Sequence, residues 1–153
     1  MMNTPETTTD RRRRRSDEPH QAIGHQLARV VKDFRLDCCL IVDQTGQVVA
    51  SSHQRSQEFV DAFASLLPLM SDHPEHEPRY LDQLRRFDDA LDEREITSCV
   101  FRAGGRRLFI GATGPEAVMN EVAIFRAITG TRRISTRRGV GGKGAWGNGT
   151  ATT

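Results

Sequence analysis

The sequence is poor in cysteine and has no long apolar run. Its three cysteines, Cys38, Cys39 and Cys99, are an odd and sparse set that does not suggest a secreted disulfide scaffold. No apolar stretch approaches the roughly 18 residues of a transmembrane span, and no hydrophobic segment follows the charged N-terminal run as in a secretory signal. We therefore expect reduced thiols in a cytoplasmic protein with no transmembrane segment.

Sequence motifs for nucleotide or metal chemistry are also missing. The phosphate-binding loop that ends in Gly-Lys-Ser/Thr is absent, and so is Gly-x-Gly-x-x-Gly after a strand. His73 and His76 have a spacing that metal ligands can use, but they lie in a proline-broken, Glu-rich segment, where a solvated acidic loop is the simpler interpretation. His25 and His53 have no nucleophile or carboxylate partner at a diagnostic spacing. The sequence thus predicts no catalytic residue, no cofactor-binding residue and no metal ligand.

The net charge of +2 comes from the two ends of the chain. Residues 20–130 contain 12 basic and 16 acidic residues, which gives −4, whereas residues 1–19 carry +1 and residues 131–153 carry +5. A protein whose folded part binds nucleic acid concentrates positive charge on a structured face. We therefore expect no nucleic-acid binding by the core.

Both ends have the composition of disordered tails. Residues 1–18 are polar and contain five successive arginines, Arg11–Arg15, whose like charges repel one another. Residues 131–153 are basic and rich in glycine, with Trp146 as their single aromatic residue. We interpret both segments as solvated linkers rather than as contacts for acidic partners or lipid, and we assign the folded domain to residues 19–130.

The first helix is expected to begin near Pro19. Proline suits the first helical turn, and the three preceding residues supply capping groups and negative charge at the positive end of the helix. The apolar residues that follow recur with a helical period and form one face: Ile23, Leu27, Val30, Val31 and Phe34.

A tight hairpin is expected next. Cys38–Val42 is apolar throughout, residues 43–46 have a turn composition, and residues 47–50 return as a second strand. Because neighbouring residues of a strand point to opposite faces, at most one of Cys38 and Cys39 can approach Cys99 across a sheet. We interpret the three cysteines as small buried hydrophobic residues, with a redox switch as the less favoured alternative.

The helix after this hairpin carries an unusually rich apolar stripe. Ser56 can cap it, and its candidate interface residues are Phe59, Val60, Phe63, Leu66, Leu67 and Met70. A small sheet rarely needs so many large side chains to cover it, so one hypothesis is that two copies of the chain pair through this stripe. The other is that the helix lies between the sheet and the segment 79–92, which is either a shorter helix or a polar edge strand.

A second hairpin and a closing helix complete the pattern. Gly104-Gly105 favours a primed two-residue turn between strands over residues 96–102 and 106–112. Thr113 and Glu116 have the spacing of a capping box, and Gly130 is expected to end the helix. The apolar residues of this helix are Val118, Val122, Ile124, Phe125 and Ile128.

The order helix, hairpin, helix, shorter helix, hairpin, helix predicts an α+β fold of the broad α/β class. Such an order describes one antiparallel sheet with helices packed on it. This architecture presents surfaces to partners as often as it supports catalysis.

The hairpin residues resemble those of the Roadblock/LC7 family. Leu40-Ile41-Val42-Asp43-Gln44-Thr45-Gly46-Gln47-Val48-Val49-Ala50 look like the first hairpin of that family, with an acidic residue and a glycine at the turn. Arg107-Leu108-Phe109-Ile110-Gly111-Ala112 look like its last strand. The resemblance covers roughly residues 20–130 and implies the profilin-like arrangement of layers. The segment 71–95 is longer and more helix-like than the corresponding part of the family.

The resemblance also implies a function. Roadblock/LC7 proteins are non-catalytic dimers whose sheets join or whose middle helices pair, and they bind Ras-like small GTPases or act as adaptors in motor complexes. In bacteria they often regulate a GTPase encoded beside them. We therefore expect a homodimeric bacterial scaffold that binds a small GTPase or another protein. The alternative is a ligand sensor of the GAF or PAS type, which would need a roomy cavity with inward polar groups.

Overall fold

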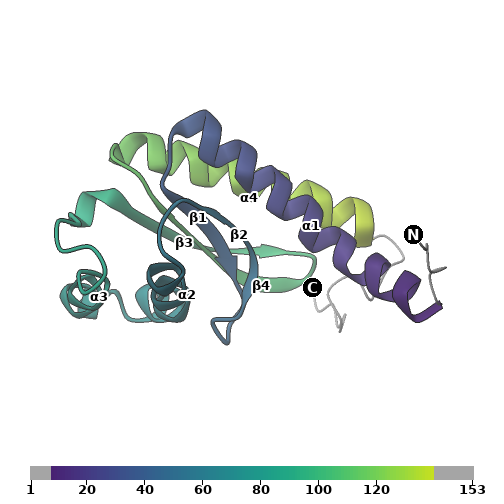
Figure 1. The fold of residues 1–153 in the computed structure, drawn as a ribbon, viewed down its shortest axis with the longest axis horizontal. Coiled ribbons are helices and arrows are strands. Elements are labelled where there is room, and N and C mark those ends of the chain that lie inside the picture. Colours follow the sequence, from purple (N-terminus) through teal and green to yellow (C-terminus); the bar gives the residue numbers. More distant parts are fainter. Residues whose placement is uncertain (1–7, 140–153) are drawn as a thin grey trace, which may run out of the picture.

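A four-stranded antiparallel sheet forms the middle layer of the protein (Figure 1). The computed structural model describes residues 8–139, with side chains from residue 19 to residue 136. The strands are β1 (Cys38–Val42), β2 (Val48–His53), β3 (Ile96–Ala103) and β4 (Arg106–Thr113), in the order β2-β1-β4-β3. This single antiparallel sheet, with helices packed on it, confirms the predicted fold class.

Helices cover both faces of the sheet. Helices α1 (Thr8–Phe34) and α4 (Ala117–Gly139) lie side by side on one face, and α2 (Gln57–Asp72) and α3 (Glu77–Leu84) lie on the other (Figure 1). Two short 3-10 turns, Pro74–His76 and Glu93–Glu95, flank α3. The described residues therefore form three layers with two separate hydrophobic cores.

The continuous apolar run in β1 follows from this three-layer arrangement. Cys39 and Ile41 pack into the core beneath α1 and α4, whereas Cys38, Leu40 and Val42 pack into the core beneath α2 and α3. All five side chains are buried. A central strand that is covered on both faces reads as continuously hydrophobic, because neither of its faces meets water.

Both hairpin turns use glycine where the backbone requires positive φ. Gly104 has φ 60° and Gly105 has φ 78°, which is the primed two-residue turn expected from the sequence. Gly46 has φ 84° in the first turn. There the Asp43 carboxylate accepts hydrogen bonds from the backbone N–H groups of Thr45 and Gln47, at 2.9 and 3.0 Å, and from the Thr45 hydroxyl at 2.6 Å.

The outer helices are longer than the sequence predicted. Helix α1 begins at Thr8 rather than near Pro19, so it includes residues 8–18, which the sequence assigned to the N-terminal tail. Arginine is a good helix former, and adding a residue to an existing helix is far easier than nucleating one. Residues 1–7 of the expected tail lie outside the described residues.

Helix α4 likewise continues past Gly130 to Gly139. Gly130 does not have the positive φ of a helix-ending glycine, and a Cβ at that position would meet the end of the Gln26 side chain of α1. Residues 131–139 of the expected tail therefore belong to α4, and residues 140–153 lie outside the described part of the chain.

The predicted capping box at the start of α4 does not form. Thr113 belongs to β4, and its hydroxyl accepts a hydrogen bond from Nε of Arg55 at 3.1 Å. Asn120 links the start of α4 to the preceding turn instead, since its side-chain amide donates to the carbonyl of Gly114 at 3.0 Å.

The segment 79–92, for which a helix and an edge strand remained open, is partly helical. Helix α3 ends at Leu84, and turns lead from there to β3. The Tyr80 hydroxyl donates toward the carbonyls of Leu69 and His73, at 3.2 and 3.0 Å, and so satisfies the last turn of α2. Helices α2 and α3 are thereby held as one unit.

Candidate interaction surfaces

The structure places the predicted α2 stripe inside the folded chain. Five of its six members pack against β1, β4 and α3 in one core and are buried. Only Met70 stays partly exposed at the margin of this core. The arrangement matches the hypothesis of a helix lying between the sheet and α3. The buried members are Phe59, Val60, Phe63, Leu66 and Leu67.

The contact between α2 and β4 is close enough to require glycine in the sheet. A Cβ on Gly111 would lie 2.6 Å from Cδ2 of Leu67 and 2.7 Å from Cζ of Phe63. The ends of these two side chains therefore fill the space above Gly111. A charged residue at either α2 position would be buried without a partner, and it would disrupt the fold rather than separate two folded copies.

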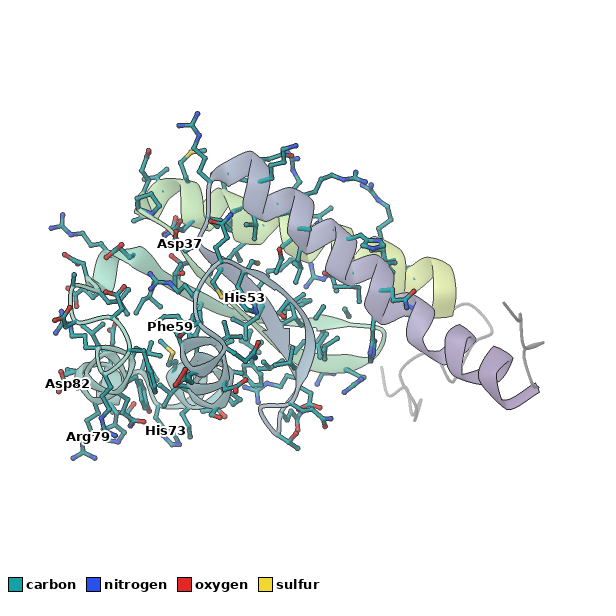
Figure 2. All side chains as sticks on the ribbon, in the orientation of Figure 1. Asp37, His53, Phe59, His73, Arg79 and Asp82 are labelled. Carbon is teal, nitrogen blue, oxygen red and sulfur yellow. The ribbon has the colours of Figure 1, made fainter. Side chains whose placement is uncertain are left out.

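Arg55, which the sequence analysis did not single out, connects four segments of the chain. Its guanidinium contacts Asp88 at 2.7 Å, Asp37 at 3.5 Å and the Thr113 hydroxyl at 3.1 Å. It also lies over the Phe59 ring, 4.3 Å from the centroid, and its side chain is only 14% exposed. Figure 2 labels Asp37, His53 and Phe59, which lie close to Arg55 in the sequence or in space. The hydrogen bond from Arg55 is the main cause that lowers the pKa of Asp88.

The exposed surface around α2 and α3 is acidic. Residues 57–95 contain 11 acidic and 4 basic residues, which gives −7, although residues 20–130 together carry only −4. Two large apolar side chains, Leu69 of α2 and Phe87 just after α3, stay exposed in this segment. Charge of one sign around a few exposed apolar groups is a common composition for a protein-binding surface. We call residues 57–95 the acidic face.

A second cluster of exposed apolar side chains lies on the opposite side of the sheet. The outer surface of α4 exposes Val118, Met119, Val122 and Phe125, and the exposed fractions of Val118 and Phe125 are 72% and 69%. The buried residues of the same helix, including Ala123, Ile124 and Ala127, face the sheet and α1. Helix α4 is thus apolar on two sides, and only one of them packs against other described residues. We call Val118, Val122 and Phe125 the α4 stripe.

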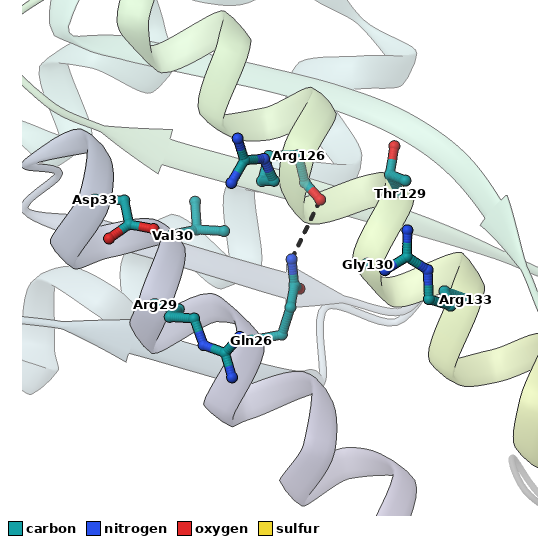
Figure 3. A pocket seen from close by; sticks show the side chains of 8 residues that line it. All are labelled: Gln26, Arg29, Val30, Asp33, Arg126, Thr129, Gly130 and Arg133. Atoms are coloured by element: carbon teal, nitrogen blue, oxygen red, sulfur yellow. Dashed lines mark hydrogen bonds between the residues drawn. The ribbon is translucent and has the colours of Figure 1, made fainter.

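A groove of about 220 Å³ runs between α1 and α4 beside this stripe (Figure 3). Its charged lining consists of Arg29, Arg126, Arg133 and Asp33. Gln26 crosses the groove and donates a hydrogen bond to the carbonyl of Arg126 at 3.2 Å. The groove is therefore polar and open, in contrast to the closed apolar pocket of a typical small-molecule site.

In the part of the chain that the structure describes, the two histidines between α2 and α3 and the three cysteines are not grouped as in a metal site or a disulfide. His73 and His76 lie 3.5 and 3.8 Å from the Glu75 carboxylate, and all three side chains are about half exposed, on the α2–α3 side where Figure 2 labels His73, Arg79 and Asp82. Among the described residues, no three His, Cys, Asp or Glu side chains gather as metal ligands would. Burial raises the pKa of the Cys38 thiol to about 12 and raises that of Cys39 as well, so both are held as neutral thiols.

No helix within residues 8–139 combines the length and the apolar composition needed to cross a membrane.

The fold resembles that of MglB from Myxococcus xanthus. The two structures match with a TM-score of 0.50 and 15% sequence identity over 89% of this chain and 96% of that chain. No protein-family model matches the sequence. No curated protein sequence matches it either. At this identity the likeness concerns the fold, and it supports the Roadblock-like architecture that the hairpin residues suggested.

Proposed function

We propose that the chain is a cytoplasmic, homodimeric, non-catalytic regulator that binds a Ras-like small GTPase. The observation that carries this proposal is the match of nearly the whole chain to MglB, together with the Roadblock-like residues of both hairpins. Roadblock-like proteins act through their surfaces, and this structure offers two candidate surfaces on opposite sides of one sheet.

The packing of the sheet disfavours the alternative of a GAF-like or PAS-like ligand sensor. Such a domain needs space between sheet and helices for its ligand. Here large side chains fill the space on both faces, with Phe63, Leu67 and Phe109 on one side and Ile23, Leu27 and Leu108 on the other. The groove in Figure 3 lies between two helices at the surface and not beneath the sheet.

In this proposal the GTPase contacts the acidic face. Its charge of −7 would attract a basic surface, and Leu69 and Phe87 would supply apolar contacts within it. Because exposed charges contribute, binding should weaken as salt is raised from 50 to about 300 mM, where the Debye length is shorter than about 8 Å.

The test is a titration of the full chain against the Ras-like small GTPases of its source organism, each loaded either with GDP or with a non-hydrolysable GTP analogue. We expect saturable binding that prefers one nucleotide state and that the Leu69→Glu variant weakens at least tenfold. The Val48→Glu variant is the matched control, because Val48 of β2 is also an exposed apolar residue but lies outside the acidic face and the α4 stripe, and it should bind the GTPase as the wild type does. Equal binding by the wild type and Leu69→Glu would contradict the proposed surface, and no binding in either nucleotide state would contradict the function.

A further inference from the structure

The α4 stripe has the spacing of a helix that pairs with another helix. Val118, Val122 and Phe125 follow one another at intervals of four and three residues, and Thr129 continues the pattern after four more. This alternation of four and three is the spacing of the two contact positions in a coiled coil. All four residues are exposed, although the buried positions of α4 already supply the contacts to the sheet and α1.

Charge along α4 is divided between its two halves. Glu116 and Glu121 flank the start of the stripe, whereas Arg126, Arg132 and Arg133 flank its end. An antiparallel pair of α4 helices would place the acidic half of each beside the basic half of the other. A parallel pair would place like charges together. The distribution is therefore complementary to itself under a two-fold axis perpendicular to the helix.

The helix dipoles favour the same arrangement, because antiparallel neighbours place the positive end of one helix beside the negative end of the other. The adjoining groove also carries both signs, with Asp33 next to three arginines. A surface of mixed charge around an apolar centre fits a second copy of itself better than a strongly acidic or strongly basic partner.

We propose that the homodimer forms through the α4 stripe, with the α4 helices of the two copies antiparallel. Val122 then faces Phe125 of the partner subunit, and Val118 faces Thr129 of the partner subunit. This inference deepens the homodimer part of the proposed function and rests on it. It differs from the joined sheets or paired middle helices that the Roadblock/LC7 resemblance implies, and the α2 stripe is already used in the core of the chain itself. The acidic faces of both copies stay open on the two outer sides of the dimer.

The first test is the solution mass of the full chain, measured by light scattering near 50 μM in 150 mM salt. We expect twice the 17.1 kDa of one chain for the wild type and 17.1 kDa for Phe125→Glu, with unchanged far-ultraviolet circular dichroism. Leu69→Glu is the matched control, because it places the same charge at an exposed apolar residue of the opposite layer, and it should stay dimeric.

A cross-linking experiment tests the antiparallel arrangement without a disruptive charge. In a Cys99→Ser background, Val122→Cys lies next to the two-fold axis and should link two chains through a short bis-maleimide. Thr136→Cys lies far from the axis, where the rise of 1.5 Å per residue separates the two copies by roughly 37 Å. It should not link in an antiparallel dimer, whereas both variants would link in a parallel one.

Three results would overturn the inference, and each differs from a failure of GTPase binding. A dimeric Phe125→Glu variant would place the dimer elsewhere, and if it also lost GTPase binding the stripe would belong to the GTPase. Linking of Thr136→Cys as efficient as that of Val122→Cys would exclude the antiparallel pair. A monomeric wild type, in which Phe125→Glu changes the fluorescence of Trp146, would assign the stripe to residues 140–153 of the same chain.

Discussion

Nη1 of Arg55 lies 2.7 Å from Oδ2 of Asp88, in a contact that joins residues 33 positions apart. Asp88 belongs to the turn after α3, and Arg55 precedes α2, so this ion pair closes the α2–α3 layer against the end of the sheet. Because the same guanidinium also reaches Asp37 and Thr113, one side chain fixes the position of four segments. The acidic face depends on this junction for its shape.

The first prediction concerns the stability that Arg55 provides. Arg55→Met should lower the free energy of unfolding by about 1.5–3 kcal/mol, because it removes charge-assisted hydrogen bonds and leaves two carboxylates without their partner. Arg94→Met is the matched control, since Arg94 is 82% exposed and lies 3.8 Å from Asp92, and it should cost less than about 0.5 kcal/mol. Urea unfolding measures both. If both variants lost the same unfolding free energy, the contacts of Arg55 would stabilise the protein no more than an exposed ion pair does.

The second prediction concerns acid. The pKa of Asp88 lies below the ordinary value of an aspartate, chiefly because of the hydrogen bond from Arg55. A carboxylate with a lower pKa in the folded state stabilises the protein above the unfolded pKa, and this contribution is lost as the pH falls through the folded pKa. The urea midpoint should therefore fall below about pH 4. Asp88→Asn should be less stable at pH 7 and should lose less stability between pH 5 and pH 3 than the wild type.

The carboxylate of Asp43 also contributes to the loss of stability at low pH. Burial alone would raise its pKa, but hydrogen bonds from Thr45 and Gln47 and the charge of Arg106 together lower it. Acid loss should therefore persist in part in Asp88→Asn. If Asp88→Asn lost as much stability between pH 5 and pH 3 as the wild type, the role of Asp88 would be contradicted.

The third prediction concerns the contact of Leu67 with Gly111. Leu67→Ala should cost about 2–5 kcal/mol of unfolding free energy, as expected for a fully buried leucine. Gly111→Ala should cost about 1–3 kcal/mol through overpacking, because the new methyl group meets the ends of Leu67 and Phe63. The double variant should lose less than the sum of the two single losses, since the new methyl group fills part of the cavity.

Additive losses in this cycle, or a folded and fully stable Leu67→Ala monomer, would contradict the placement of Leu67 in the core and would return the α2 stripe to consideration as an interface.

The fourth prediction concerns the thiols. Cys38 and Cys39 are fully buried and their pKa values are raised, so in the folded protein at pH 8 neither should react with a thiol reagent within minutes. Cys99 lies on the outer strand β3 and is partly exposed, so it should react first. Titration with a chromogenic disulfide should show one accessible thiol before denaturation and three after it. Fast reaction of all three thiols would indicate that the sheet opens.

The hairpins could be predicted from the sequence because their determinants are local. The apolar run Cys38–Val42 and the glycine pair at 104 and 105 act within a few residues, and the structure confirms both. The limits of α1 and α4 could not be predicted in this way. Gly130 looks like a helix terminator in sequence, but in the structure it lies inside α4 without the positive φ of such a terminator, next to the Gln26 side chain of α1.

The functional surfaces were harder to predict, because burial depends on what covers each face. The α2 stripe and the α4 stripe have the same helical period in sequence, yet the sheet and α3 cover the first and no part of the described chain covers the second. Arg55 has no sequence signature at all, since its partners Asp37, Asp88 and Thr113 are 18, 33 and 58 residues away.

The most direct test of the proposed function is the effect of the full chain on its small GTPase. The rates of GTP hydrolysis and of nucleotide release should be measured for the Ras-like small GTPase that the chain binds, with and without a saturating amount of the chain. A regulator predicts that at least one of the two rates changes several-fold and that Leu69→Glu abolishes the change. Rates that stay the same at saturation would contradict a regulatory role.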